Sequence, residues 1–353
     1  MGRTAIKLKP LSVVLCAILL AAAPAQGLEA EFYGQGHISA DSVDDGQNRS
    51  EYFASNSSRL GLRGRQQLSD GIDLLFQYEQ GVDLTGQGEN DGNGPGSTSG
   101  LFTAARVSYL GVTGDYGTLR AGKLDGLNQW VYDYNLFADQ VGDLGNLWGG
   151  TGLAGRISDA AQYVSPVFEG FTVGLTYVPE EGVDDADLFL LKADYQRNEL
   201  KLGLAFADIG SDWQAIALTG GYEWDEFTFG GGWQREESIA DIRGNDRNSY
   251  TVGASFALKN GVIFKAQVAR SNGKATDSDA TQWSVGVDYQ WDSALTLYLA
   301  LATTQNDDNA TFSANNWGKG DAVFPAAGQN PNAVSFGMVY RFQMSAGRHP
   351  SGS

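Results

Sequence analysis

Basic residues recur before residue 124, in segments where polar and apolar residues alternate. Four acidic residues lie in the stretch that follows, between Lys123 and Arg156. The basic residues are Arg59, Arg63, Arg65, Arg106, Arg120 and Lys123, with Arg156 beyond the stretch. The acidic residues within it are Asp125, Asp133, Asp139 and Asp143. A cationic wall that faces an acidic segment sets up a transverse electric field. Water and small polar solutes tolerate such a field, whereas apolar solutes do not. This pattern therefore indicates a charged aqueous passage.

Other kinds of chemistry lack the residues they need. The only histidines are His37 and His349, and the single cysteine is Cys16. The chain therefore has too few of these residues for a typical catalytic triad, zinc site or disulfide bond. Residues Gly117–Lys123 spell a GxxxxGK pattern, but Leu124 stands where a phosphate-binding loop needs Ser or Thr. We therefore expect no enzymatic activity, no cofactor and no bound metal.

Residues 1–25 have the features of a signal peptide. Arg3, Lys7 and Lys9 form a basic start, Leu11–Leu20 is a short apolar core, and Ala23–Ala25 fits a small-x-small cleavage site. The apolar core is too short for a membrane-spanning helix. Removal of the segment would change the formal net charge from -18 to -21. Such an acidic chain is not expected to bind nucleic acid.

Residues 26–342 have the pattern of one β-barrel. Apolar residues alternate with polar or small ones in sixteen runs, for example from Leu200 to Phe206 and from Trp283 to Trp291. Short turns alternate with long polar links, and aromatic residues gather at the short-turn ends, as in transmembrane barrels. A soluble all-β sandwich or solenoid is the competing class, but it explains neither feature. We predict an all-β fold, a 16-stranded antiparallel transmembrane β-barrel, followed by a polar tail at residues 343–353.

The stretch between Lys123 and Arg156 interrupts this pattern. It has no two-residue periodicity, and a structureless loop of this length in a compact domain is usually functional. Sixteen antiparallel strands enclose an aqueous channel rather than a packed core. We therefore expect a long constriction loop that folds into the lumen and narrows the channel.

The sequence resembles the general diffusion porins of the Gram-negative outer membrane, the general bacterial porin family. Five segments carry the resemblance in order: Glu31–Gly34, Ser58–Gly64, Tyr116–Lys123, Gly155–Ile157 and Val339–Phe342. The resemblance implies a homotrimer. From the residues themselves, the outward apolar faces are expected to contact outer-membrane lipid, and external carboxylates such as Asp44 and Asp45 are candidates to share divalent cations with lipopolysaccharide. It also implies that the third external loop folds into each pore, where basic wall residues face acidic loop residues.

The resemblance also suggests which residues form the constriction. Asp143 matches a constriction aspartate of the family, and Leu147 stands where the family has a second carboxylate. The predicted pore constriction comprises Arg59, Arg63, Arg106, Arg120, Lys123, Asp143, Leu147, Trp148 and Arg156. Lys123 does not share the inward parity of its strand, so it needs a β-bulge or the start of the loop to turn its side chain inward. The last strand presents an outward stripe similar to the family's assembly signal, namely Phe336, Met338, Tyr340 and Phe342.

The predicted function is passive diffusion of ions and small hydrophilic solutes through a water-filled channel. A solute-specific channel is the alternative, with an aromatic surface made by Trp130, Tyr132, Tyr134, Phe137 and Trp148. Adhesion or phage binding by the external loops is compatible with either. The loop carboxylates lead us to expect weak ion selectivity, cationic at low salt and drifting toward neutral or anionic as salt rises.

Overall fold

A computed structural model describes residues 28–86, 101–126, 134–148, 155–179, 187–209 and 213–346. The expected signal peptide and residues 347–353 lie outside these ranges. None of the helices in the described ranges is long and apolar enough to span a membrane.

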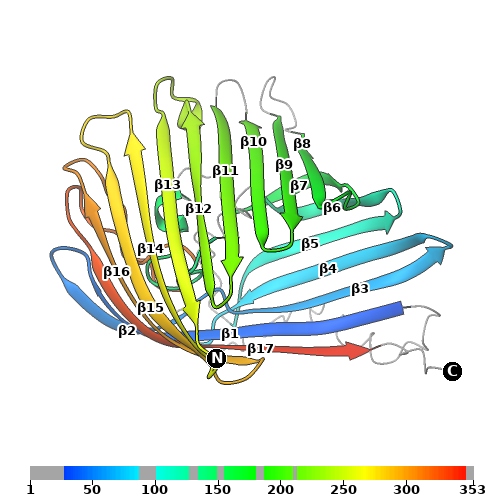
Figure 1. Ribbon diagram of the computed structural model, residues 1–353, viewed down its shortest axis with the longest axis horizontal. Coiled ribbons are helices and arrows are strands. Elements are labelled where there is room, and N and C mark those ends of the chain that lie inside the picture. The colour runs from blue at the N-terminus through cyan, green and yellow to red at the C-terminus, as the bar shows by residue number, and fades with distance from the viewer. Residues whose placement is uncertain are drawn as a thin grey trace, which may run out of the picture.

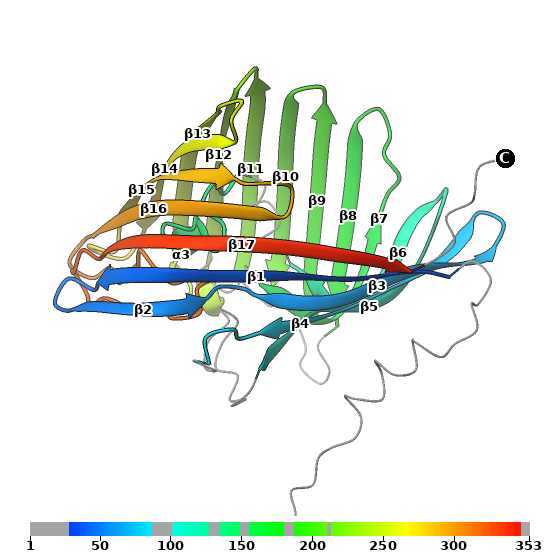
Figure 2. The same cartoon turned by 90° about the horizontal axis from the view of Figure 1, so that it is seen from below.

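The strands form one antiparallel sheet that closes on itself, because the first strand, β1, pairs along its length with the last, β17 (Figure 1). Of the seventeen strand segments, β2 and β3 pair with the two halves of β1 and are separated only by residues 56–58. They are therefore one interrupted strand, which Figure 2 shows beside β1 and β17. The predicted fold class, a 16-stranded antiparallel barrel, is confirmed.

The element bounds follow the predicted runs closely. The strands are β1 (Leu28–Asp44), β2 (Arg49–Ser55), β3 (Arg59–Ser69), β4 (Ile72–Val82), β5 (Phe102–Gly114), β6 (Gly117–Asp125), β7 (Arg156–Val164), β8 (Phe171–Val178), β9 (Leu188–Arg197), β10 (Leu200–Ile209), β11 (Trp213–Trp224), β12 (Phe227–Glu237), β13 (Arg247–Ala257), β14 (Val262–Gly273), β15 (Ala280–Gln290), β16 (Leu295–Asn306) and β17 (Asn332–Ala346). Two short helices lie in loops, α3 (Gly145–Trp148) and η1 (Ile239–Asp241).

Alternation of side chains gives the barrel an apolar outer face. In β17, Phe336 and Tyr340 are 59% and 50% exposed, whereas Ser335 between the outward positions is buried. In a membrane barrel the outward residues contact lipid and the inward residues face the lumen. The stripe of Phe336, Met338 and Tyr340 thus lies on the outer face, and Phe342 packs against Phe32 at a ring distance of 5.8 Å.

Short turns join the strands at one end of the barrel. Asn198 and Asp225 adopt left-handed backbone conformations in these turns, which their short polar side chains favour. Aromatic residues gather beside the turns: Trp224 lies 6.3 Å from Phe227, and Tyr289 lies 6.0 Å from Trp291. Amphipathic rings favour the membrane interface, so this end marks one edge of the lipid layer.

The two faces of β11 provide a test of this arrangement. Leu218 points outward and is 48% exposed, whereas its neighbour Thr219 points inward and is buried. We expect Leu218→Arg to destabilise the folded barrel by about 2–4 kcal/mol, because it places a charge in the lipid. Thr219→Ser should cost much less, since it keeps the hydroxyl. Unfolding in urea from lipid vesicles measures both, and equal losses would contradict the assignment of faces.

Two predicted details are wrong. From the alternation in β5, the side chains of Val107 and Tyr109 are expected on the outer face. In the structure, Val107 is buried and lines the cavity. The Tyr109 ring also points inward, with its centre 5.1 Å from the guanidinium carbon of Arg120. An irregularity in the β4–β5 pairing shifts the register there and reverses the faces. The barrel also does not end at Phe342, because β17 continues to Ala346, which pairs with Ala30.

The buried core lies between the barrel wall and the loops that fold inside it. The segment 134–148 packs Leu144, Leu147 and Trp148 against small inward residues, including Ala205 and Ala217. A second cluster packs Phe137 and Val141 against β16 and β17. Small wall residues leave the space that these loop side chains fill, and this packing fixes the loop inside the lumen.

Candidate functional site: the pore constriction

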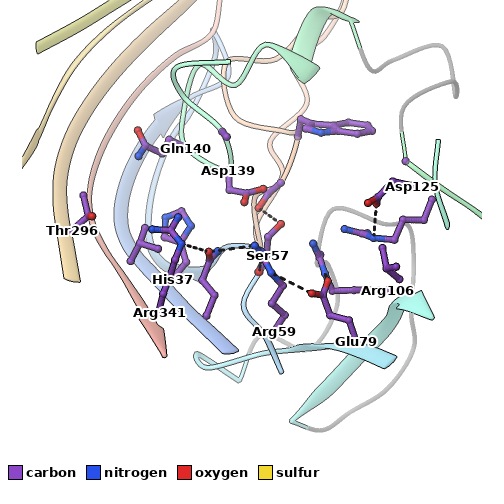
Figure 3. A pocket seen from close by; sticks show the side chains of 18 of the residues that line it. His37, Ser57, Arg59, Glu79, Arg106, Asp125, Asp139, Gln140, Thr296 and Arg341 are labelled. Carbon is purple, nitrogen blue, oxygen red and sulfur yellow. Dashed lines mark hydrogen bonds and ion pairs between the residues drawn. The ribbon is translucent and has the colours of Figure 1, made fainter. Parts of the chain in front are cut away.

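A cavity of about 840 Å³ lies inside the barrel, between its wall and the inward loops. Figure 3 shows residues from several strands and from the loops converging on this space. Charged side chains of both signs line the cavity among the described residues. The basic ones are Arg59, Arg106, Arg120, Arg156, Lys192 and Arg341, and the acidic ones are Glu79, Asp125, Asp139 and Asp288.

The basic wall begins on β17 and β1 and continues through β3 to β5. Gln35 accepts hydrogen bonds from Arg341 Nε at 3.0 Å and from Arg59 Nη2 at 3.3 Å. Glu79 then pairs with Arg59 at 3.6 Å and with Arg106 at 2.6 Å. The carboxylate and the amide hold neighbouring guanidinium groups in fixed positions despite their mutual repulsion.

The wall continues on β6 and β7. Arg120 Nε donates to Gln162 Oε1 at 2.8 Å, and Arg156 pairs with Asp125 at 3.6 Å. Arg120 thereby remains a net positive group on the cavity surface, while the charge of Arg156 is balanced by a nearby carboxylate. The guanidinium groups of Arg59, Arg106, Arg120 and Arg156 thus all line the same cavity, and we call this group the guanidinium wall.

The constriction loop is seated against the opposite wall by polar contacts. Lys265 on β14 donates to Gln140 Oε1 at 2.9 Å, pairs with Asp288 at 2.9 Å and lies 4.6 Å from the Phe137 ring centre. Ser284 Oγ donates to the carbonyl oxygen of Gly142 at 3.1 Å. These bonds hold the loop segment at a fixed distance from the basic wall.

Asp143 organises the turn of the loop from within. Its carboxylate accepts hydrogen bonds of 2.7 Å each from Asn135 Nδ2 and from the backbone N–H groups of Asp139 and Gly145. The side chain is fully buried. Burial raises the pKa of Asp143 to about 8, and the charge of Asp139 adds to the rise, while the backbone donors oppose it. Because the side chain is buried within the loop, Asp143 is not part of the cavity lining.

The prediction that Asp143, Leu147 and Trp148 line the constriction is wrong. All three side chains are at most 1% exposed, and Leu147 and Trp148 pack against the barrel wall. Their apolar surfaces gain more from contact with inward alanines than from exposure to water. Phe137 is buried in the same way, and Tyr134 lies against Gly221 and Gly230 of the wall. Trp130 and Tyr132, also predicted for the aromatic surface, lie outside the described residues.

Two predicted basic residues lie away from the cavity. Arg63 pairs with Glu31 at 2.5 Å and stacks over Tyr33, and its side chain is 52% exposed. The β6–β7 pairing does have a register irregularity at Lys123, as an inward turn of this side chain would need. Lys123 is nevertheless not among the residues that line the cavity. The structure does bring together Arg59, Arg106, Arg120 and Arg156.

Several cavity residues were missed as site residues by the sequence analysis. Asp139 occupies the place expected for Asp143, with its carboxylate close enough to act electrostatically on Arg59. Arg341 and Glu79 could have been found from their inward positions in β17 and β4. Trp317 and Gly318 come from the last long loop, 307–331, and had no such signal.

The burial of Asp143 leads to a specific prediction. Asp143→Asn should leave the reversal potential of the channel unchanged, because the side chain does not reach the lumen. It should instead weaken the loop turn by about 1 kcal/mol, since the amide nitrogen cannot accept one of the three hydrogen bonds. Reversal potential and thermal unfolding measure the two effects. A shift of potential as large as that of Asp139→Asn would contradict the placement.

The sequence matches the Gram-negative porin family over residues 12–309. The chain belongs to the Gram-negative porin family. This porin is 27% identical to the outer membrane porin protein 32 of Delftia acidovorans, over 87% of this chain and 90% of that one. It is 24% identical to the major outer membrane protein P.IB of Neisseria sicca, over 68% and 76% of the two chains.

Solved structures agree with this assignment. The anion-selective porin from Comamonas acidovorans superposes with a TM-score of 0.76 at 26% identity, covering 89% of this chain and all of that one. A trimer form of OmpT from Vibrio cholerae shares the fold, with a TM-score of 0.67 at 18% identity. The porin is thus a multi-pass barrel of the Gram-negative outer membrane that forms a passive diffusion channel.

Proposed function

We propose that the cavity is the constriction of this channel and that it passes ions and small hydrophilic solutes with a preference for anions. The charge of the lining supports this proposal: the described residues contribute six basic and four acidic side chains. Three of the four acidic side chains, Glu79, Asp125 and Asp288, are already paired with cations. The guanidinium wall therefore dominates the field that a passing ion meets.

This proposal revises the expected cation preference at low salt. That expectation depended on loop carboxylates at the narrowest point. Asp143, however, is buried away from the lumen, and Asp139 is the one carboxylate of the segment 134–148 that lines the cavity. The related porin from Comamonas acidovorans is described as anion-selective. The acidic external surface still favours cations in the vestibules, so the net preference should be weak.

A solute-specific channel is the second candidate, but the members of its predicted aromatic surface that the structure describes do not line the cavity. The described members Phe137 and Trp148 are buried, and Tyr134 faces the wall. Swelling of liposomes that contain the purified protein distinguishes the two functions. For a non-specific channel, the swelling rate should rise linearly with the concentration of a small sugar and should fall as the size of the sugar increases. A swelling rate that saturates with one solute, and that analogues of this solute reduce by competition, would contradict the proposal of non-specific diffusion.

We further infer that the porin acts as a homotrimer and catalyses no reaction. The trimer form of OmpT, which shares the fold, supports the assembly. The similar proteins are channels rather than enzymes, and the lining residues are engaged in hydrogen bonds and ion pairs that fix a passage. Cross-linking of the detergent-extracted protein should give a trimer band, and a monomer alone would refute the assembly.

A further inference from the structure

The outer face of the barrel carries a groove across β12 to β15, strands that lie side by side (Figure 1). The groove has a volume of about 380 Å³. The strand register places Ala254 next to Ala266, with Phe229 beyond the first alanine and Val285 beyond the second. The two alanines therefore form the floor of a hollow between larger outward side chains.

Phenylalanine rings close the end of the groove that is nearer the short turns. Phe227, Phe256 and Phe264 are paired in one row across β12, β13 and β14. The rings of Phe227 and Phe256 stack with their centres 4.6 Å apart, and Phe264 is 51% exposed. Lys265 also borders the groove, but its amine is bound inside the barrel. The outward side chains that line the groove are all apolar, so the groove suits an acyl chain.

The groove extends from the membrane interface into the lipid layer. Tyr289 and Trp291 mark the interface beside it, with ring centres 6.0 Å apart, and Tyr289 pairs with Val262 at the start of β14. Ala266 lies farther along β14, about 13 Å from Val262. This end of the barrel carries the short turns, which face the periplasm in outer-membrane barrels. The lipid that meets the groove therefore belongs to the inner leaflet, which consists of phospholipid rather than lipopolysaccharide.

The short turn next to the groove differs in charge from the other short turns. It joins β13 to β14 over residues 258–261 and contains Lys259, which is exposed, and no acidic residue. Each of the other short turns, all within the described ranges, has at least one acidic residue and no basic one between its strands. These acidic residues are Asp70, Asp115, Glu169, Glu199, Asp225, Glu226 and Asp292. An anionic headgroup is therefore attracted to the turn at Lys259 and repelled by the others.

We propose that the groove and Lys259 together form a binding site for one anionic phospholipid of the inner leaflet. One acyl chain lies over Ala254 and Ala266, and the phosphate lies at the Lys259 amine. Lipid already surrounds all apolar surface here, so van der Waals contact with a matching shape holds the chain, and the charge selects the headgroup. The site lies on the outside of the barrel wall, so the inference does not depend on whether the channel prefers anions.

Native mass spectrometry of the delipidated porin in detergent tests the site with phosphatidylglycerol and phosphatidylethanolamine as probes. Each native protomer should bind one phosphatidylglycerol about fivefold more tightly than phosphatidylethanolamine, the factor expected for one lysine beside an anionic lipid. Lys259→Gln should remove this preference and leave the affinity for phosphatidylethanolamine unchanged. Ala254→Leu/Ala266→Leu fills the floor of the groove and should weaken the binding of both lipids severalfold.

Matched controls make the same substitutions away from the groove. Ala193→Leu enlarges the outer face of β9, where the neighbouring Lys192 lines the cavity inside. Arg197→Gln removes an exposed cation at the end of β9, beside another short turn. Both variants should bind each lipid as the native porin does.

Resistance to SDS before heating and native single-channel conductance show that each variant is folded. If the double leucine variant does not fold, Ala266→Leu alone fills part of the floor and should weaken the binding of both lipids to a smaller extent. Equal affinities of the native porin for the two lipids would show an adventitious additive only and would overturn the proposal. Native binding of both lipids by folded Lys259→Gln and groove-filling variants would overturn it as well.

Discussion

Lys265→Met is expected to raise the single-channel conductance and the current noise, because it removes the cation that seats the constriction loop. Lys265 is only 3% exposed in its side chain, and it contacts Asp288, Gln140 and the Phe137 ring together. Loss of one partner of a buried ion pair costs roughly 3 kcal/mol or more. Methionine can retain the contact with Phe137 but cannot bind the two oxygen atoms.

The matched control is Lys201→Met. Lys201 also forms a lysine–carboxylate pair within the barrel, with Glu223 at 2.8 Å, but the two side chains are 43% and 52% exposed. An exposed pair contributes little, so this variant should keep the native conductance. If the Lys265→Met variant folded and showed the conductance and current noise of the native channel, the constriction loop would be held by its apolar packing alone.

The second large effect concerns ion selectivity. Arg59→Ser should shift the reversal potential toward cations and raise the conductance, while Asp139→Asn should shift the potential toward anions. A unit charge about 7 Å from a passing ion in water acts with roughly 0.6 kcal/mol, which changes relative permeability about threefold before screening. Reversal potentials across a salt gradient measure both shifts.

Both substitutions should preserve the fold. After loss of Arg59, Glu79 keeps its ion pair with Arg106 at 2.6 Å, so the Glu79 carboxylate stays paired. Asp139 has a φ of 60°, and Asn tolerates this left-handed conformation as well as Asp does. Arg63→Ser serves as the control, because Arg63 pairs with Glu31 away from the cavity. An equal shift from Arg63→Ser would show that the narrow zone lies elsewhere.

The barrel itself could be predicted because its strands follow a simple rule. Outward apolar and inward small residues alternate along β10, β15 and β17, and turn residues such as Asn198 mark the hairpins. The rule failed in β5, where a register irregularity reverses the faces of Val107 and Tyr109. Such an irregularity adds no distinctive residue, so alternation alone could not reveal it.

The constriction was only partly predictable for a different reason. Arg59, Arg106, Arg120 and Arg156 lie on strands, and their positions follow from the strand register. Asp139 and Asp143 lie in a loop, where backbone conformation rather than spacing decides which carboxylate faces water. The left-handed backbone at Asp139 and the hydrogen bond from Asn135 Nδ2 to Asp143 accompany an arrangement in which Asp139, rather than Asp143, lines the cavity.

The last long loop, 307–331, shows the same limit over a longer distance. Lys319 in this loop forms a buried ion pair with Asp41 on β1, but the two are separated by most of the chain, and neither belongs to a recognisable motif. Only the closure of β1 on β17 brings the last loop beside the break after β2. The sequence therefore predicts a long external loop there, whereas the structure places its central segment inside the barrel.

The reversal potential of the native channel, measured across a tenfold salt gradient at low and at high mean salt, tests the proposed constriction most directly. High salt shortens the screening length to about 3 Å at 1 M and so suppresses the field of the acidic vestibules. The constriction charges then dominate, because ions pass close to them. We predict an anion-selective potential at high salt that weakens as the mean salt is lowered. A cation-selective potential at high salt would contradict a pore governed by the guanidinium wall.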